Sequence, residues 1–271
     1  GHARFLRERG RELSGFGTGE AVRAELVVPP GRGTRALAAL GTPLVALGRE
    51  IQTLLSLLVR TVWLSVRGKR DRKEIFNQAY QIGNRSVGFL SVTMGFIGMI
   101  LVFQAGIQAL RIVPDLTLLG ATFLELLVRD LAASIGAMML ATRVGAGIAA
   151  EIGSMVVTEQ VDALRMCAAD PIEYLVVPRF IASIVMTFCL LLFGGTVAFL
   201  AGMVTANVVF EVNYATFANF QLVDIGDVSV GLAKCLAYGA AIPIVSARAG
   251  LATFGGSEGV GWATTSAVVN S

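Results

Sequence analysis

Hydrophobic and polar positions follow one another along this chain in long blocks. Four blocks are apolar enough, and long enough at about 20 residues or more, to cross a bilayer as helices. These runs cover 86–110, 118–150, 180–210 and 228–247. The second run is too long for one perpendicular crossing, so we expect it to be tilted or to extend past the bilayer. The pattern predicts an all-α fold, a polytopic bundle of membrane helices.

The first 85 residues have a different pattern. Residues 1–35 are rich in Arg, Glu and Gly, which predicts a loosely ordered tail. Across 36–66, Leu, Ile and Val recur at helical spacing between charged residues, as is typical of an amphipathic helix lying in the membrane interface. A soluble core helix is the alternative. A basic cluster and a short polar helix at 74–85 follow, so we expect 36–85 to form one interfacial segment before a membrane domain at 86–271.

A polar connector at 151–179 separates the second and third apolar runs. Connections between helices usually take about 2–8 residues, so this one is long enough to form a short helix of its own. Apolar and charged positions are interleaved in it, as on a helix that a soluble protein can dock against. An ordinary solvated loop is the alternative. The candidate docking residues are Glu151, Met155, Glu159, Asp162, Leu164 and Arg165.

Composition supports a membrane protein. The chain is 55% hydrophobic and 15% charged, whereas soluble domains carry about 25% charged residues. Its net charge of +3 is better explained by basic loops on the cytoplasmic side than by nucleic-acid binding, for which no interleaved basic and aromatic patch is present.

The charges of the loops predict a topology. The segment 67–85 carries six Lys and Arg residues and is expected in the cytoplasm. The loop 211–227 has three acids and no Lys or Arg, which suits the outside. Together with the connector 151–179 on the inside, these loops predict a multi-pass protein with a cytoplasmic N-terminus.

Four ionisable residues lie within the apolar runs, and a fifth, Arg143, lies near the cytoplasmic end of the second run. An ionised group at mid-membrane costs about 3 kcal/mol on insertion scales, so such groups normally pair or face a wet cavity. Glu125 and Arg129 are four residues apart and can pair along one helix, which leaves Asp130 to meet Lys234. These residues either line the polar part of a cavity or only hold the helices together.

Motifs for chemistry are missing from the sequence. There is no GxxxxGK[ST] phosphate loop, no GxSxG and no HExxH, and the one histidine is His2. Three cysteines without a CxxC pair predict neither a disulfide nor a metal site. We therefore expect no catalytic residue, and a transporter of this kind would draw energy from a separate ATPase or from an ion gradient. A membrane scaffold is a third possibility.

Several stretches in the second half of the chain resemble the signature of the MlaE/YrbE family of ABC-transporter permeases. They are Arg143-Val144-Gly145-Ala146-Gly147, Ala150-Glu151-Ile152-Gly153-Ser154-Met155, the stretch 158–164, Asp170-Pro171, Val177-Pro178-Arg179, and the stretches 255–261 and 263–269. Gly95 to Met99 and Gln104 fit the family's first span. The resemblance covers about 85–271, with the motifs in the family's order.

The resemblance implies a homodimeric permease in the bacterial inner membrane. Each copy would sit on a cytoplasmic ABC ATPase, which binds ATP and Mg, through the connector helix. A periplasmic MCE-domain protein, typically a hexamer, would complete a system for phospholipid or a related lipid, of the kind that maintains outer-membrane lipid asymmetry. The resemblance links Arg129, Asp130 and Lys234 to function. It also places the lipid cavity between the copies, lined by the first span, where Phe96, Met99 and Gln104 are the candidates.

Two departures from the family pattern stand out. The family often has Arg-Glu-Leu-Gly-Pro in the second span, where this chain has Arg129-Asp130-Leu131-Ala132-Ala133. The family also continues into one further span after the 263–269 motif, and we expect that span to be missing from this chain.

Overall fold

The computed structural model describes residues 32–68, 72–112 and 116–271, with side chains described from residue 48 onward. All its regular elements in these ranges are helices, which confirms the all-α prediction. Most of the tail predicted at 1–35 lies outside the described residues. The chain divides into two compact units, 1–53 and 54–271, and the second contains every apolar run.

Helix α3 runs from Arg32 to Arg67 and confirms a helix where the amphipathic pattern predicts one. In its C-terminal half, Leu57 and Thr61 are buried within the second unit. The opposite side exposes a row of apolar side chains at helical spacing, namely Leu55, Val59, Val62 and Val66. Such a row suits a helix at a membrane surface, and that location stays a prediction.

Three helices are long and apolar enough to cross a membrane among the residues the structure describes. They are α4 (Arg72–Ile112), α9 (Val177–Phe210) and α11 (Ile225–Leu251). The short polar helix expected at 74–85 is not separate, because α4 runs through it without a break. Hydropathy marks only the apolar part of such a helix, so the predicted run begins 14 residues late, at 86 rather than 72.

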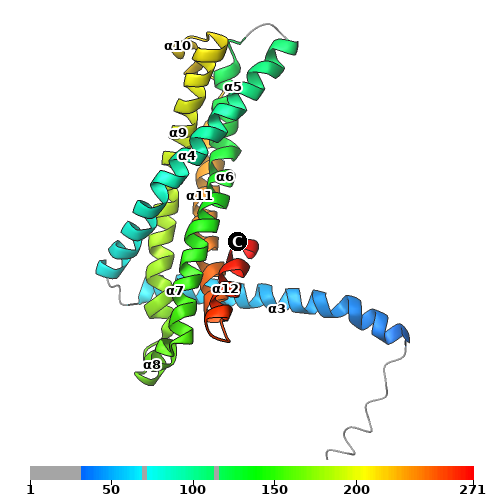
Figure 1. Cartoon of the computed structure of the whole chain (residues 1–271), viewed down its shortest axis with the longest axis vertical. Coiled ribbons are helices and arrows are strands. Elements are labelled where there is room, and N and C mark those ends of the chain that lie inside the picture. Colours follow the sequence, from blue (N-terminus) through cyan, green and yellow to red (C-terminus); the bar gives the residue numbers. More distant parts are fainter. Residues whose placement is uncertain (1–31, 69–71, 113–115) are drawn as a thin grey trace, which may run out of the picture. The chain divides into compact units, whose positions relative to one another are not determined.

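The run predicted at 118–150 is not one uniform α-helix. It folds as α5 (Leu119–Leu126), the π-helical turn η2 (Leu127–Leu131), α6 (Ala132–Leu140), the π-helical turn η3 (Ala141–Gly145) and α7 (Ala146–Val157). These pieces follow one another along the length of the bundle (Figure 1). A π-turn adds a residue to one helical turn and re-aims the side chains after it, and such turns often mark functional sites.

Short elements close the two ends of the bundle. The connector contains α8 (Gln160–Met166) and the π-helical turn η4 (Ile172–Val176), while the loop after α9 contains α10 (Tyr214–Phe217), and α12 (Ser257–Asn270) ends the chain. Figure 1 shows α8 at one end, and α10 with the start of α5 at the other. This arrangement agrees with loops that alternate between two sides of a membrane.

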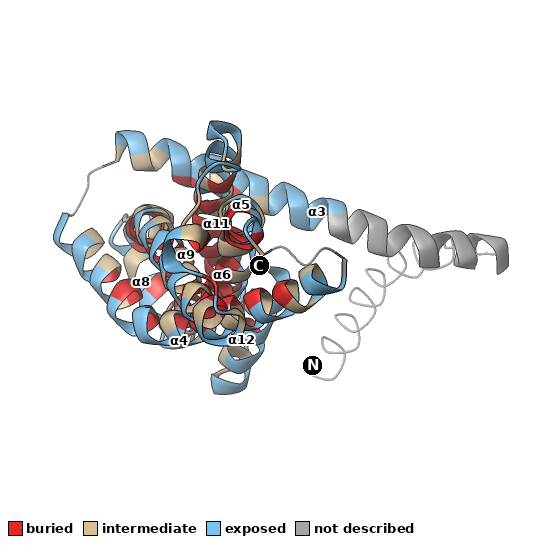
Figure 2. Ribbon diagram, turned by 90° about the horizontal axis from the view of Figure 1, so that it is seen from above, coloured by how far each residue is buried: buried red, intermediate tan, exposed pale blue. Residues whose placement is uncertain are grey.

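The core lies where α4, α6, α9 and α11 face one another. Leu90, Met94, Leu140 and Leu191 are completely buried there, and Figure 2 shows buried residues on the inner faces of the helices. A Cβ atom at Gly98 of α4 would overlap the Ala198 carbonyl of α9, so this glycine permits close packing of the two spans. The outward faces expose many large apolar side chains, as expected for a surface that lipid or protein covers.

Candidate functional site: a charged network beside an apolar cavity

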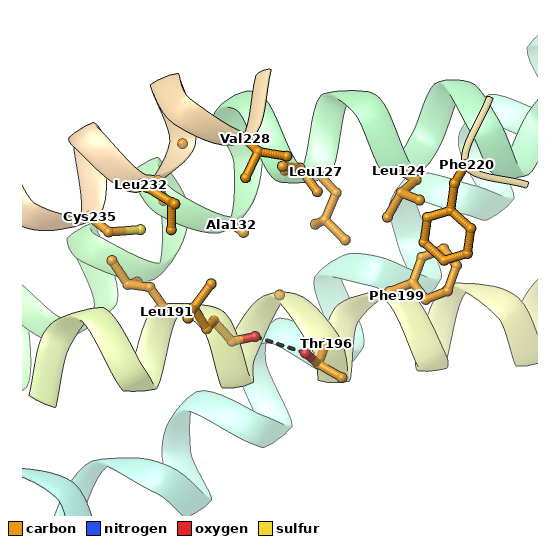
Figure 3. A pocket seen from close by; sticks show the side chains of 15 residues that line it. Leu124, Leu127, Ala132, Leu191, Thr196, Phe199, Phe220, Val228, Leu232 and Cys235 are labelled. Atoms are coloured by element: carbon orange, nitrogen blue, oxygen red, sulfur yellow. Dashed lines mark hydrogen bonds between the residues drawn. The ribbon is translucent and has the colours of Figure 1, made fainter. Parts of the chain in front are cut away.

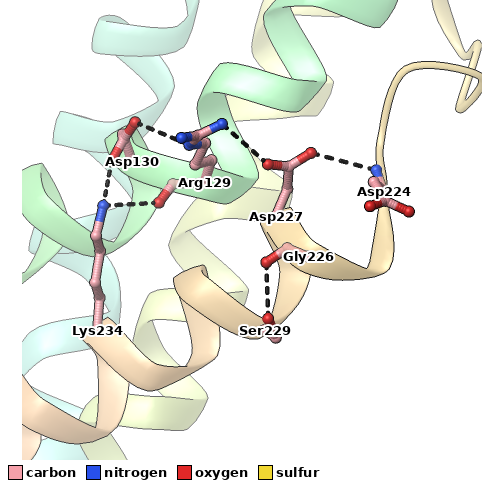
Figure 4. A network of polar contacts seen from close by, with 7 residues as sticks. All are labelled: Arg129, Asp130, Asp224, Gly226, Asp227, Ser229 and Lys234. Atoms are coloured by element: carbon pink, nitrogen blue, oxygen red, sulfur yellow. Dashed lines mark hydrogen bonds and ion pairs between the residues drawn. The ribbon is translucent and has the colours of Figure 1, made fainter.

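Lys234 of α11 reaches across to the π-turn η2 (Figure 4). Its ammonium group donates to the carboxylate of Asp130 and, at 3.1 Å, to the backbone carbonyl of Arg129. A carbonyl beside a π-turn can be left without its usual helical donor, and here a cation from the neighbouring span bonds to it. The meeting of Asp130 and Lys234 agrees with the pairing expected from the sequence.

The partner predicted for Arg129 is wrong. Its Nη1 lies 3.3 Å from Asp227 Oδ1 and its Nε lies 3.9 Å from Asp130 Oδ2, so its ion pairs in the described structure do not include Glu125. Residues four apart stack on a regular α-helix, but η2 begins between Glu125 and Arg129 and widens that turn.

Asp227 is the member of the network that the sequence analysis missed. Its Oδ2 accepts from the backbone amide of Asp224 at 3.3 Å, and the two aspartates form a capping box at the start of α11. Asp227 thus caps α11 with one oxygen and holds Arg129 with the other. Its place seven residues before Lys234, two turns along the same helix face, is the signal that could have found it.

The network has no net charge, because two cations meet two carboxylates. Its members differ in exposure: the side chains of Arg129 and Asp130 are 54% and 48% exposed, and that of Asp227 is 14% exposed. Charged groups within membrane spans normally face a bundle interior or a wet cavity. We therefore expect water or another protein at the exposed side of Arg129 and Asp130.

An apolar cavity of about 290 Å³ lies beside the network (Figure 3). Its walls are the segment from α5 to α6 and the helices α9 and α11. The hydroxyl of Thr196 in its wall donates to the carbonyl of Leu192 at 2.9 Å, so this polar group is satisfied within its own helix. The surface suits a hydrocarbon chain. Its principal lining residues are Leu124, Leu127, Leu191, Phe199, Phe220, Leu232 and Cys235.

Gly231 lies between the cavity and the network on α11. A Cβ atom there would overlap the backbone carbonyl of Val128, so the absent side chain lets α11 lie directly against η2. Lys234 follows less than one turn later and needs this closeness to reach Asp130. Val128 and Gly231 also line the cavity, so one close contact shapes both features.

The candidate docking residues of the connector fall on three pieces. Glu151 and Met155 belong to α7, Glu159 occupies a left-handed turn with φ of 59°, and Asp162, Leu164 and Arg165 lie on α8. Glu159, Asp162 and Arg165 are exposed, and Arg165 pairs with Asp162 at 2.9 Å. A helix therefore forms where the connector pattern predicts one, but it is shorter than the predicted docking segment.

A cavity of about 280 Å³ lies between α8 and η4. Met155 and Leu164 line it with Val161, Tyr174 and Leu175, so these two candidates face inward, next to the exposed charges of α8. Two ion pairs hold the connector in place: Arg179 Nη2 lies 2.8 Å from Glu151 Oε1, and Arg60 Nη2 of α3 lies 2.7 Å from Asp170 Oδ2.

The candidates of the first span lie apart from the network. Phe96 and Gln104 are exposed on α4 and Met99 is half-buried. None of the three lines the apolar cavity beside the network. Phe96 belongs to an outward-facing stripe of α4 with Val92, Ile100 and Phe103, so these residues can contribute to a site only on the outer face of this chain.

The chain is similar to known proteins over most of its length. The family described as Permease MlaE matches residues 75–271. A probable ABC transporter permease protein of Synechocystis is 38% identical over 76% of this chain and 79% of its own length. One of Rickettsia conorii is 39% identical over 73% and 76%. The chloroplast protein TRIGALACTOSYLDIACYLGLYCEROL 1 of Arabidopsis thaliana is 33% identical over 76% of this chain and 59% of its own length. The chain therefore belongs to the MlaE family of ABC transporter permeases.

Proposed function

We propose that this permease moves a phospholipid, or a lipid of similar build, in an ATP-driven transporter of the inner membrane. The observation that carries the proposal is the apolar cavity of about 290 Å³ beside a charged network within one bundle. A lipid is amphiphilic and needs apolar surface for its chains and polar surface for its head. The Arabidopsis thaliana relative, whose name is that of a glycolipid, adds support.

We further propose that two copies of the chain form the translocation unit, with their N-termini in the cytoplasm. The exposed charges of Arg129 and Asp130 and the apolar outer stripe of α4 are surfaces that a second copy could cover. A periplasmic MCE-domain protein would contact the end that carries α10. An ABC ATPase, holding ATP and Mg, would dock at the end that carries α8.

The connector would transmit the movement of the ATPase. The turn at Glu159 joins α8 to α7, and from α7 the helical path through η3 and α6 to η2 has no loop in it. A displacement at α8 would reach Arg129 and Asp130 through this turn and this path. The two π-turns are places where such a path can change register. Transport by this route requires that the two states of the permease differ in their affinity for lipid.

Charge reversal on the connector tests this coupling. In proteoliposomes with the ATPase and the MCE-domain protein, we expect Glu159→Lys and Asp162→Lys to retain ATP hydrolysis and to lose at least tenfold in lipid transport. Glu258→Lys is the matched control, since Glu258 is exposed and lies outside the connector. Normal transport by both connector variants would contradict the docking role.

An ion-gradient transporter is the second candidate, because Asp130 and Lys234 form a pair of proton-binding groups between two spans. The same proteoliposomes separate the two. Transport that requires ATP and survives an uncoupler supports the first candidate. Transport that continues without ATP and stops with the uncoupler supports the second.

A further inference from the structure

A second cavity, of about 550 Å³, lies between the first half of α4 and the segment from η3 to α7. Its lining is more polar than that of the cavity beside the network. Arg85 of α4 and Arg143 of η3 both line it, so each wall contributes one arginine. This cavity belongs to the end of the bundle that carries the connector, since Glu151 and Ser154 of α7 also contribute to it.

The cavity holds uncompensated positive charge. No carboxylate lies in ion-pair contact with Arg85 or Arg143 in the part of the chain that the structure describes. Arg143 lies 5.7 Å over the ring of Phe89, which is a contact that leaves its N–H groups available. Glu151 is the acid of the lining, and its charge is balanced by Arg179, 2.8 Å away.

Neutral hydrogen-bonding groups complete the lining. Ser86 is 1% exposed, and its hydroxyl has no hydrogen-bond partner. Buried polar groups nearly always have a partner, so this hydroxyl is available to bond a ligand at the cavity wall. Gln78 is also buried, and its side-chain nitrogen donates to Glu74 at 2.9 Å. Its side-chain oxygen is left available to accept from other partners.

We propose that this cavity binds the phosphate-bearing headgroup of a membrane lipid. Two arginines with free N–H groups can hold phosphate oxygens in paired, charge-assisted hydrogen bonds, and the Ser86 hydroxyl can donate one more. A route for the acyl chains starts beside it, because Phe89, Val92 and Phe96 form an exposed apolar row on α4 that begins one turn after Arg85. The inference rests on the proposed function, in which the transported molecule is a lipid.

Lipid retention by the full-length permease, without its ATPase, tests the inference. The protein is exchanged into detergent with either phosphatidylglycerol or diacylglycerol of the same acyl chains, and bound lipid is counted by native mass spectrometry. We expect at least tenfold greater retention of phosphatidylglycerol. Equal retention of the two lipids would overturn a phosphate site.

Variants locate the binding. Arg85→Gln combined with Arg143→Gln is expected to lower phosphatidylglycerol retention about tenfold, whereas Arg111→Gln, a single loss of charge near the other end of α4, leaves it unchanged. A second variant, Gly147→Leu, keeps both arginines and places a side chain in the cavity, where a Cβ atom meets nothing within 4 Å. It is expected to lower phosphatidylglycerol retention by filling the site. Its control is Gly88→Leu, which should leave retention unchanged, since Gly88 is equally open but lies outside the cavity.

Free phosphate is the other source of the same chemistry. Arginine-dependent binding of radiolabelled inorganic phosphate by lipid-free protein would assign the cavity to a free anion and overturn the lipid proposal. No such binding, with arginine-dependent retention of phosphatidylglycerol, supports it. Loss of ATP-driven transport with retention intact would count against the proposed function and leave this site standing.

Discussion

Glu151 and Arg179, the first and last residues of the polar connector, form an ion pair 2.8 Å long. The side chain of Arg179 is 5% exposed, and its second nitrogen donates to the carbonyl of Leu175 at 2.7 Å. The pair ties the body of α7 to the start of α9 and closes the connector into a lobe with both ends fixed. Force applied to α8 therefore acts on two spans together.

Breaking this pair should destabilise the protein. Glu151→Gln removes the charge that Arg179 faces while keeping the size of the side chain. A hydrogen bond to a charged group contributes about 1.5–3 kcal/mol, and because Glu151 is 39% exposed, we expect a loss of about 1–2 kcal/mol. The free energy of unfolding in detergent measures this loss.

Asp162→Asn is the control. Both side chains of the Asp162–Arg165 pair are 65% exposed, so this variant should change stability by less than about 0.5 kcal/mol. Equal losses would mean that burial of Arg179 has no energetic weight.

Variants of Asp130 and Lys234 can separate a function of this ion pair in transport from a purely structural one. Asp130→Asn and Lys234→Met are each expected to lower ATP-driven lipid transport at least tenfold. The exchanged variant, Asp130→Lys with Lys234→Asp, keeps an ion pair but loses the bonds of Lys234 to the Arg129 carbonyl and of Arg129 to Asp130. We expect it to restore expression and folding but not transport. Restored transport would make the pair a purely structural one.

Gly231 should be intolerant of even a methyl group. Gly231→Ala forces α11 away from the Val128 carbonyl, and overpacking of this kind costs about 1–3 kcal/mol. The larger separation also stretches the contact of Lys234 with Asp130, so transport should fall with stability. Gly261→Ala on α12 is the matched control. Its Cβ atom meets nothing within 4 Å, and alanine should gain up to about 1 kcal/mol there through helix propensity. Similar behaviour of the two variants would contradict the close contact.

Hydropathy was sufficient for the helical class and for α4, α9 and α11, because a membrane span must carry a long apolar run. It could not show the two π-turns of the second run, since adding one residue to a turn leaves composition unchanged. The error over Glu125 and Arg129 follows from this, because the i, i+4 rule assumes regular helix geometry.

Three of the four members of the charged network could be predicted from the sequence. Arg129, Asp130 and Lys234 stand out as charges within apolar runs, whereas Asp227 stands in a polar loop and looks ordinary there. Its role depends on α11 beginning at Ile225, which places Asp227 in the first turn and opposite Arg129. Likewise, Arg85 and Arg143 are 58 positions apart in sequence, and only the placement of α4 beside η3 brings them to one cavity.

Glu159 offers a way to separate the backbone of the connector from its side chains. Its φ of 59° is a left-handed conformation that costs a non-glycine residue about 1–2 kcal/mol. Glu159→Gly relieves this strain and, after the added flexibility of glycine in the unfolded chain, should gain about 0.5–1 kcal/mol of stability. Ala168, with φ of 57°, has the same conformation at the other end of α8, so Ala168→Gly should gain as much. If the Glu159 carboxylate contacts the ATPase, Glu159→Gly alone uncouples ATP hydrolysis from transport. Equal coupling in the two variants would assign Glu159 a role in the turn only.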